Sequence, residues 1–235
     1  MIKLVVLLLA VLLMHSIAPA QNRKAQYKLD PYGQKLSSDF MDLGSKYPDN
    51  AMAFRITPDS GRVYQFNAPR YSAYKINYAD FRRKAEELSG KTFSDSTIFI
   101  ITYSYKDDAC SDWFSNKMSR GLINRRKEHY DTQKRFIEKT YKNSVFLILF
   151  EEDIILSNNP KSKREYFYTD KDNFFRKTIF TNPTLCGSHG IIKPDGVTLI
   201  HNGEYRADWM AKHLKPEIWN SFFDSEQINL SPPKK

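Results

Sequence analysis

Two apolar runs on either side of one long amphipathic stretch constrain the fold of this chain more than any other feature. Residues 97–105 read TIFIITYSY and residues 145–150 read VFLILF, so neither run alternates cleanly between apolar and polar side chains. Such runs are typical of central parallel strands that helices cover on both faces. The stretch between them predicts a long amphipathic helix over residues 112–141. We therefore predict a βαβ unit with a right-handed crossover.

Shorter elements are predicted on both sides of this unit. Before it, the polar residues 21–31 are expected to be loose, and the spacing of apolar residues predicts a helix over 36–47. Turn residues between two alternating runs predict a hairpin of 53–57 and 62–66. A second helix is predicted over 78–88, with Asn77 as its N-cap and Gly90 after its end. After it, the pattern predicts a minor strand over 164–168, a short helix over 172–180, a hairpin of 189–193 and 197–201, and a closing helix over 204–219.

The first twenty residues have the features of an export signal. Lys3 precedes the apolar residues 4–14, and residues 18–20 read Ala-Pro-Ala, which suits cleavage before Gln21. A run of about a dozen apolar residues is short for a membrane span. We therefore expect an exported product, periplasmic or secreted, with no transmembrane segment after signal removal.

The chain is basic, with a formal net charge of +9. Its positive charges gather at residues 82–84, 125–127 and 161–164, where acidic residues are interleaved with the first two clusters. Solvated helix faces and loops explain this pattern most simply, and peripheral association with an anionic envelope surface is the alternative. Export argues against nucleic acid as a partner.

The element order over residues 93–220, together with the hairpin sequence Gly190-Ile-Ile-Lys-Pro-Asp-Gly196, resembles the thioredoxin-like (redoxin) superfamily. In both, a strand, a cysteine loop, a long helix, a strand, a short helix, a hairpin and a final helix follow one another. The resemblance implies an α/β fold with a thioredoxin-like central sheet flanked by helices. Residues 21–92 are then an N-terminal helix/hairpin extension, and residues 221–235 a polar C-terminal tail.

Two departures from the superfamily argue against ordinary disulfide exchange. Trp113 stands where the second cysteine of a Cys-x-x-Cys pair is expected after Cys110, and no proline immediately precedes the strand at Gly190. No peroxiredoxin-type Pro-x-x-x-Thr-x-x-Cys pattern leads into Cys110 either. Asp107 and Asp108 oppose thiolate formation there, although a helix N-terminus would favour it. We therefore expect a degenerate member without dithiol catalysis.

The same resemblance places the loops of Cys110 and Cys186, the only cysteines of the chain, opposite each other at one edge of the sheet. Two cysteines in an exported chain are more often bonded than free. We expect a stabilising disulfide that closes a loop of 76 residues (186 − 110). Two unpaired thiols and a reversible redox couple are the alternatives.

The remaining candidate side chains have simpler structural interpretations. His189 lies three residues after Cys186 and is the one candidate for a Cys–His nucleophile pair, but an ordinary loop histidine is the simpler interpretation. No Cys-x-x-Cys or His-x-x-x-His spacing occurs, so neither a metal nor a cofactor is expected. Caps, turns and the core account for the other candidates: Asp107, Asp108, Asp112, Asp195, Trp113, Phe114, Trp209 and Trp219.

Three functional hypotheses follow. The leading one is an exported thioredoxin-like binding or accessory module that a Cys110–Cys186 disulfide stabilises and whose partner is an unidentified protein or anionic molecule. In the enzyme hypothesis, Cys110 is the nucleophile, Cys186 the resolving thiol and His189 a proton carrier of a noncanonical thiol-disulfide reductase or thiol peroxidase. The third is a basic envelope protein that binds anionic polymers or lipid headgroups.

Overall fold

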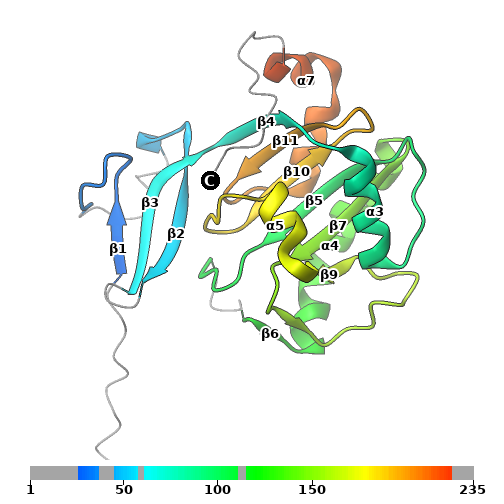
Figure 1. The fold of residues 1–235 in the computed structure, drawn as a ribbon, viewed down its shortest axis with the longest axis horizontal. Helices are drawn as coiled ribbons and strands as arrows, with labels where there is room; N and C mark the ends of the chain where they lie inside the picture. Colours follow the sequence, from blue (N-terminus) through cyan, green and yellow to red (C-terminus); the bar gives the residue numbers. More distant parts are fainter. Residues whose placement is uncertain (1–25, 37–44, 58–60, 111–114, 224–235) are drawn as a thin grey trace, which may run out of the picture.

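The computed structural model describes residues 26–36, 45–57, 61–110 and 115–223 (Figure 1). Its strands are β1 (Gln26–Leu29), β2 (Asn50–Thr57), β3 (Gly61–Pro69), β4 (Tyr71–Lys75), β5 (Ile98–Ser104), β6 (Lys117–Met118), β7 (Ser144–Phe150), β8 (Ile155–Leu156), β9 (Phe167–Thr169), β10 (Ser188–Ile192) and β11 (Val197–Asn202). Its helical segments are α3 (Tyr78–Ser89), α4 (Arg120–Thr140), η1 (Lys171–Asn173), α5 (Phe174–Thr178), α6 (Ala207–Ala211), η2 (Lys212–Leu214) and α7 (Pro216–Phe223). The fold is mixed α/β, as predicted.

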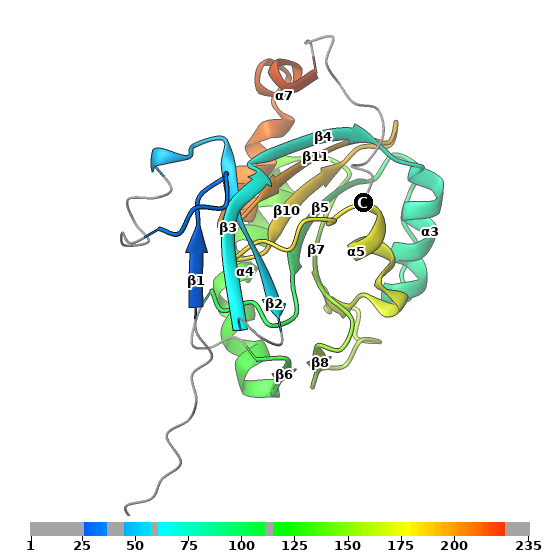
Figure 2. The ribbon, with the colours of Figure 1, turned by 60° about the vertical axis from the view of Figure 1, so that its left-hand side comes forward.

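A six-stranded sheet in the order β4-β11-β10-β5-β7-β9 forms the centre of the molecule. β5, β7 and β9 run parallel to one another, whereas β10, β11 and β4 join by antiparallel pairing. Helices α3 and α5 cover one face of the sheet and α4 lies on the other (Figures 1 and 2). All but one residue of β5 and of β7 is buried, which confirms the predicted βαβ unit and its apolar central strands.

The helix of the βαβ unit begins later than predicted. α4 starts at Arg120 rather than at residue 112, because Ser119 is its N-cap and accepts a hydrogen bond from the backbone N–H of Leu122. The residues just before the cap are extended: β6 pairs in parallel with β8. Residues 111–114 lie outside the described part of the chain. α4 therefore begins ten positions after Cys110 (120 − 110).

The segment before β5 contains both confirmed and unpredicted elements. β2 and β3 form the predicted antiparallel hairpin, and α3 has the predicted Asn77 N-cap and the left-handed Gly90 at its end. Residues 26–29, predicted to be loose, instead form β1 and pair in parallel with β3 to complete a three-stranded sheet, β1-β3-β2. The sequence also did not predict β4, which joins the central sheet at β11. The helix predicted over residues 36–47 falls mostly outside the described residues.

The C-terminal half follows the predicted order with shorter elements. The hairpin is confirmed as β10 and β11, and the minor strand and short helix appear as β9 and α5. The single closing helix predicted over residues 204–219 is wrong: it is divided into α6, η2 and α7. Lys215 has an extended backbone immediately before Pro216, because the proline ring disfavours a helical conformation in the residue before it. In the described residues, no helix is long and apolar enough to cross a membrane.

Candidate functional site

Cys110 and Cys186 form the predicted disulfide, with an S–S distance of 2.09 Å and a Cα–Cα distance of 4.7 Å. β10 runs antiparallel beside β5 with Ser188 opposite Tyr103. The loop that leaves β5 and the loop that enters β10 therefore meet at one edge of the central sheet. This strand pairing explains why two cysteines 76 residues apart are bonded.

Asp108 connects the two cysteine loops through its buried carboxyl group. Its Oδ1 accepts hydrogen bonds from the backbone N–H of Cys110 at 3.0 Å and of Cys186 at 3.1 Å, and the residue is only 5% exposed. Burial raises the pKa of Asp108 to about 6, although these hydrogen bonds and the charge of Arg126 act in the opposite direction. From the sequence, Asp108 was interpreted as a cap or turn residue, and its hydrogen bond with Cys186 was not predicted.

The backbone of the second cysteine loop is left-handed at two consecutive residues. Cys186 has φ +68° and Gly187 has φ +78°. A Cβ atom on residue 187 would lie 2.4 Å from the backbone oxygen of Tyr103, so only glycine fits there. The side chain of Thr184 donates a hydrogen bond to the carbonyl oxygen of Gly187 at 2.7 Å. The loop therefore has one tightly defined path against β5.

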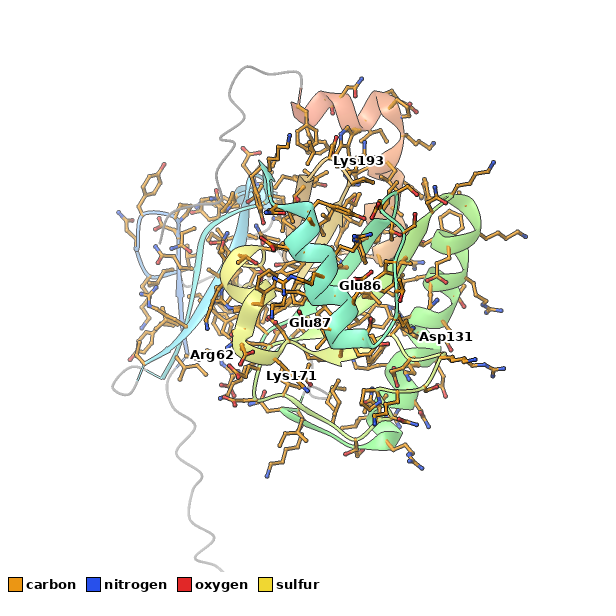
Figure 3. All side chains as sticks on the ribbon, turned by 45° about the vertical axis from the view of Figure 1, so that its right-hand side comes forward. Arg62, Glu86, Glu87, Asp131, Lys171 and Lys193 are labelled. Carbon is orange, nitrogen blue, oxygen red and sulfur yellow. A yellow bond between two sulfur atoms is a disulfide. The ribbon has the colours of Figure 1, made fainter. Side chains whose placement is uncertain are left out.

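The three-stranded sheet contacts both cysteine loops. Arg62, on β3 (Figure 3), donates a hydrogen bond to the backbone oxygen of Asp107 at 2.8 Å. β2 pairs with the segment before Cys186: the N–H of Leu185 donates to the carbonyl oxygen of Met52 at 2.9 Å. Two adjacent strands of the three-stranded sheet thus hold the cysteine loops in place, in addition to the central sheet.

A polar cavity of about 210 Å³ opens beside the disulfide, and we call it the disulfide hollow. Cys110 is exposed and Cys186 is half-buried. Arg126 and Glu204 bring opposite charges to the hollow. The other lining residues are Thr102, Ser104, Asp108, His129, Tyr130, His189 and Tyr205. The hollow therefore presents both hydrogen-bonding groups and an aromatic wall.

His189 is not the loop histidine that the sequence predicted. It lies in β10, is 2% exposed, and its Nδ1 is 3.0 Å from the hydroxyl oxygen of Thr102. Burial lowers the pKa of His189 to about 4, so it is neutral at pH 7. In the described part of the chain, no hydrogen bond joins it to Cys110 or Cys186. The arrangement is that of a buried histidine with its own partner.

A second histidine lies beside the hollow, and its burial and stacking were not predicted. His201 lies opposite His189 in the β10–β11 pair and stacks on Tyr205 with ring centroids 4.1 Å apart. Its buried Nδ1 has no hydrogen-bond partner among the described residues. Burial, reinforced by the nearby charges of His189 and Arg70, lowers its pKa to about 3. The register set by the Pro-Asp-Gly turn was the one sequence signal that pairs these two histidines.

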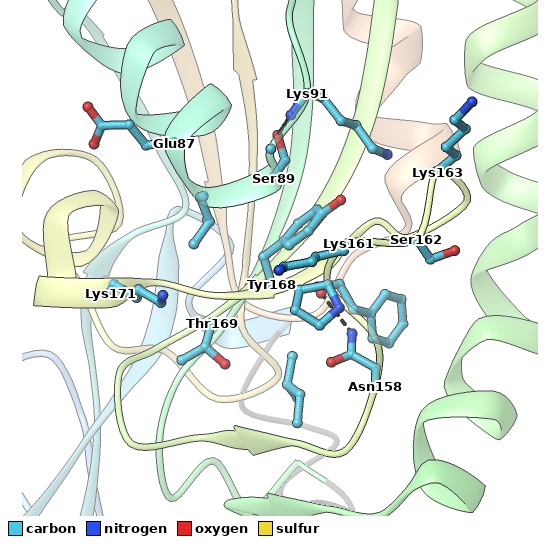
Figure 4. A pocket seen from close by; sticks show the side chains of 15 residues that line it. Glu87, Ser89, Lys91, Asn158, Lys161, Ser162, Lys163, Tyr168, Thr169 and Lys171 are labelled. Carbon is cyan, nitrogen blue, oxygen red and sulfur yellow. Dashed lines mark hydrogen bonds between the residues drawn. The ribbon is translucent and has the colours of Figure 1, made fainter.

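A larger cavity of about 480 Å³ lies between the C-terminal end of α3, the loop of residues 156–163 and β9 (Figure 4). Four lysines line it, Lys91, Lys161, Lys163 and Lys171, and we call it the lysine cavity. The sequence indicated only the charged run 161–164. Lys91 and Lys171 are 80 residues apart (171 − 91), so no local pattern predicts that they line one cavity.

The other predicted candidates divide into three groups. Asp112, Trp113 and Phe114 lie outside the described residues. Asp107 lies in a turn and accepts a hydrogen bond from the side-chain amide of Asn116, and Asp195 accepts one from the backbone N–H of Val197 within the hairpin turn. Among the described residues, no group of three or more histidine, cysteine or acidic side chains is placed to hold a metal ion. Trp219 is buried as predicted, but Trp209 is 46% exposed, so its assignment to the core is wrong. No protein-family model, curated protein or solved structure matches this chain.

Proposed function

We propose that this chain is an exported, thioredoxin-like protein without dithiol catalysis, which acts as a binding or accessory module through the disulfide hollow. The observation that carries this proposal is the pair of hydrogen bonds from Cys110 and Cys186 to the buried carboxyl of Asp108. The carboxyl and the disulfide together fix two loops into one preformed surface. Such preorganisation lowers the entropic cost of binding a partner.

The strand order supports the thioredoxin-like part of the proposal. β11-β10-β5-β7, with β5 parallel to β7 and β10 antiparallel to β5, is the arrangement that the resemblance implies for residues 93–220. The crossover between β5 and β7 is the long helix α4. β4 and β9 extend this core at its two edges.

The surroundings of Cys110 support the absence of dithiol catalysis. A reactive cysteine of this superfamily is typically placed at the start of the long helix, where the helix macrodipole lowers its pKa, whereas α4 begins at Arg120 and does not include Cys110. Asp108, when ionised, adds a negative charge beside both sulfur-bearing residues. Neither group favours the thiolate that exchange chemistry requires.

A second candidate function, thiol-disulfide exchange, is favoured by one observation. Cys110 is exposed at the mouth of the disulfide hollow, so a small thiol can reach its sulfur. In that case Cys110 and Cys186 are the redox couple of a thiol-dependent oxidoreductase.

Redox equilibration of the oxidised full chain decides between the two candidates. The binding-module proposal predicts a bond with a potential below about −300 mV, as is usual for structural disulfides, and no insulin-reducing or peroxide-consuming turnover. A couple near roughly −200 mV whose turnover is lost in both Cys110→Ser and Cys186→Ser would overturn that proposal and establish exchange.

Binding at the hollow is tested by photocrosslinking in the native host. A photoreactive amino acid in place of Glu204, an exposed residue of the hollow, is expected to give a discrete adduct. The matched control replaces Lys139, which is exposed on α4 and does not line the hollow. Identical adducts at both positions, or none at residue 204, count against the hollow as a contact surface. Sequencing of the recovered protein tests export, with Gln21 expected as the first residue.

A further inference from the structure

The lysine cavity has the size of a small-molecule site. Its volume of about 480 Å³ falls within the range of roughly 300–1,000 Å³ that is usual for such sites. The end of α3, the loop of residues 156–163 and the edge strand β9 form its walls (Figure 4). None of its lining residues belongs to the disulfide hollow, so the two cavities are separate.

The lysines of the lysine cavity form no ion pairs with the described carboxylates. Lys161, Lys163 and Lys171 are exposed, and in the described ranges no carboxylate forms an ion pair with any of them or with Lys91. The amine of Lys91 donates to a neutral acceptor, the backbone oxygen of Glu165, at 2.5 Å. Burial and the nearby charge of Lys134 lower the pKa of Lys91 and outweigh the opposite effect of Glu138 and Glu165, so an added anion would stabilise its charged form.

The negative groups at the cavity do not balance these charges. Glu87 is the one carboxylate among the lining residues, and it already pairs with Arg83 at 2.7 Å and with Lys84 at 2.8 Å. Figure 4 shows its carboxylate directed away from the labelled lysines. The C-terminal end of α3 contributes a partial charge of only about −0.5. The positive charge of the four lysines exceeds this partial charge, so the cavity carries a net positive charge.

The cavity also has an apolar wall. Leu88, Leu156 and Pro160 line it, and the buried rings of Phe167 and Tyr168 lie beneath. Leu88 and Leu156 are half-buried, so each still has apolar surface that a ligand can cover. Burying that surface is worth about 25 cal/mol per Å². A ligand that fits must therefore offer an apolar portion as well as a negative charge.

We propose that the lysine cavity binds a small organic anion that carries an apolar portion, such as an alkyl carboxylate or alkyl phosphate. Lysine amines act as point charges and do not select planar, bidentate acceptors as arginine does, so carboxylate and phosphate heads are both accommodated. The same chemistry occurs in a lipid at a membrane surface and in a free soluble ligand. This inference is independent of the disulfide hollow and of the function proposed for it.

Calorimetric titration of the full chain with laurate tests the proposal. We expect one laurate per chain and an affinity at least about tenfold weaker in Lys161→Gln/Lys171→Gln, because two attractive charges are lost. The matched control, Lys75→Gln/Lys142→Gln, removes two exposed lysines outside the cavity and should bind as the unaltered chain does. Equal weakening in both double variants, or no laurate binding at about 1 mM, would overturn the proposal.

Two further probes define the ligand. Inorganic phosphate alone should bind more weakly than laurate; equal affinity would overturn the requirement for an apolar portion. If the ligand is a lipid, the chain should cosediment with phosphatidylglycerol vesicles but not with phosphatidylcholine vesicles, and Lys161→Gln/Lys171→Gln should abolish this cosedimentation. Laurate binding without vesicle binding supports the proposal with a free ligand as the source.

Discussion

The disulfide hollow and the lysine cavity differ in how the protein satisfies their polar groups. At the disulfide hollow, Asp108 accepts two backbone hydrogen bonds and His189 pairs with Thr102. At the lysine cavity, Lys161 and Lys171 have no carboxylate partner in the described part of the chain. Internal hydrogen bonds thus hold the disulfide hollow, whereas the lysine cavity retains positive charge that only ions or a ligand can balance.

This difference has an energetic consequence. Changes at the disulfide hollow should reduce the free energy of unfolding, because its groups are part of the internal hydrogen-bond network. Changes at the lysine cavity should leave stability nearly unchanged and alter binding instead. Four sets of variants test this contrast, and their expected effects decrease from the disulfide to the lysine cavity.

Loss of the disulfide should have the largest effect. Cys110→Ser/Cys186→Ser removes the constraint on a 76-residue loop of the unfolded chain, so the free energy of unfolding should fall by up to about 4 kcal/mol. Urea unfolding measures the change, and the reduced unaltered chain serves as the control because it should match the double variant. A loss below about 1 kcal/mol would show that hydrogen bonds alone hold the two loops together.

Substitution of Gly187, the left-handed glycine of the second cysteine loop, should have the second-largest effect on stability. Gly187→Ala forces a Cβ atom against the oxygen of Tyr103 at a positive φ, and the expected loss is about 3 kcal/mol. Gly90→Ala is the matched control, because residue 90 also has a positive φ but faces open space, and it should cost about 1 kcal/mol. Equal losses in thermal or urea unfolding would contradict the close packing of this loop against β5.

The buried His201 should make the stability of the protein sensitive to acid. The pKa of His201 is about 3 in the folded protein and about 6.5 in the unfolded chain, so below pH 6.5 the unfolded chain takes up the proton and stability falls toward pH 3. His201→Phe retains an aromatic ring and should lose about 2 kcal/mol less between pH 7 and pH 4.5. His129→Gln, at an exposed position, is the control. An unchanged acid slope in His201→Phe would exclude His201 as its source.

The smallest effect on stability should come from the lysine cavity. Lys161→Gln/Lys171→Gln changes two exposed side chains without ion-pair partners in the described residues, so the free energy of unfolding should change by less than about 0.5 kcal/mol. Urea unfolding in the absence of laurate measures this. A larger loss would mean that these lysines have a structural role, and the contrast between the two cavities would fail.

Local sequence signals predicted several elements well. Asn77 and Gly90 mark the two ends of α3 because a cap side chain and a left-handed glycine act on neighbouring backbone groups. The predicted start of α4 was wrong because the apolar spacing extends into residues that precede its N-cap, Ser119. Residues 26–29 show no strand pattern of their own, and β1 forms because β3 offers a pairing edge.

The candidate site was predicted in part. The Cys110–Cys186 pairing followed from the expected adjacency of two loops, and the structure confirms it. The roles of Asp108 and His201 were not predicted, because each depends on contacts between residues far apart in the chain. His189 was interpreted as a loop histidine although the predicted hairpin strand already began at residue 189, and the structure places it within β10, which begins at Ser188.

The sequence by itself determined the apolar central strands and the capped helix before them. These features depend on side-chain periodicity or on caps within a few residues. The pairing of the two cysteines was an expectation that rested on the resemblance, and the pairing of β10 with β5 decided it. Only the tertiary structure decided that a buried carboxyl joins both cysteine loops and that four distant lysines surround one cavity. The physical reason is that hydrogen bonds and electrostatic fields depend on distance in space, which strand order and helix packing set and which sequence separation does not reveal.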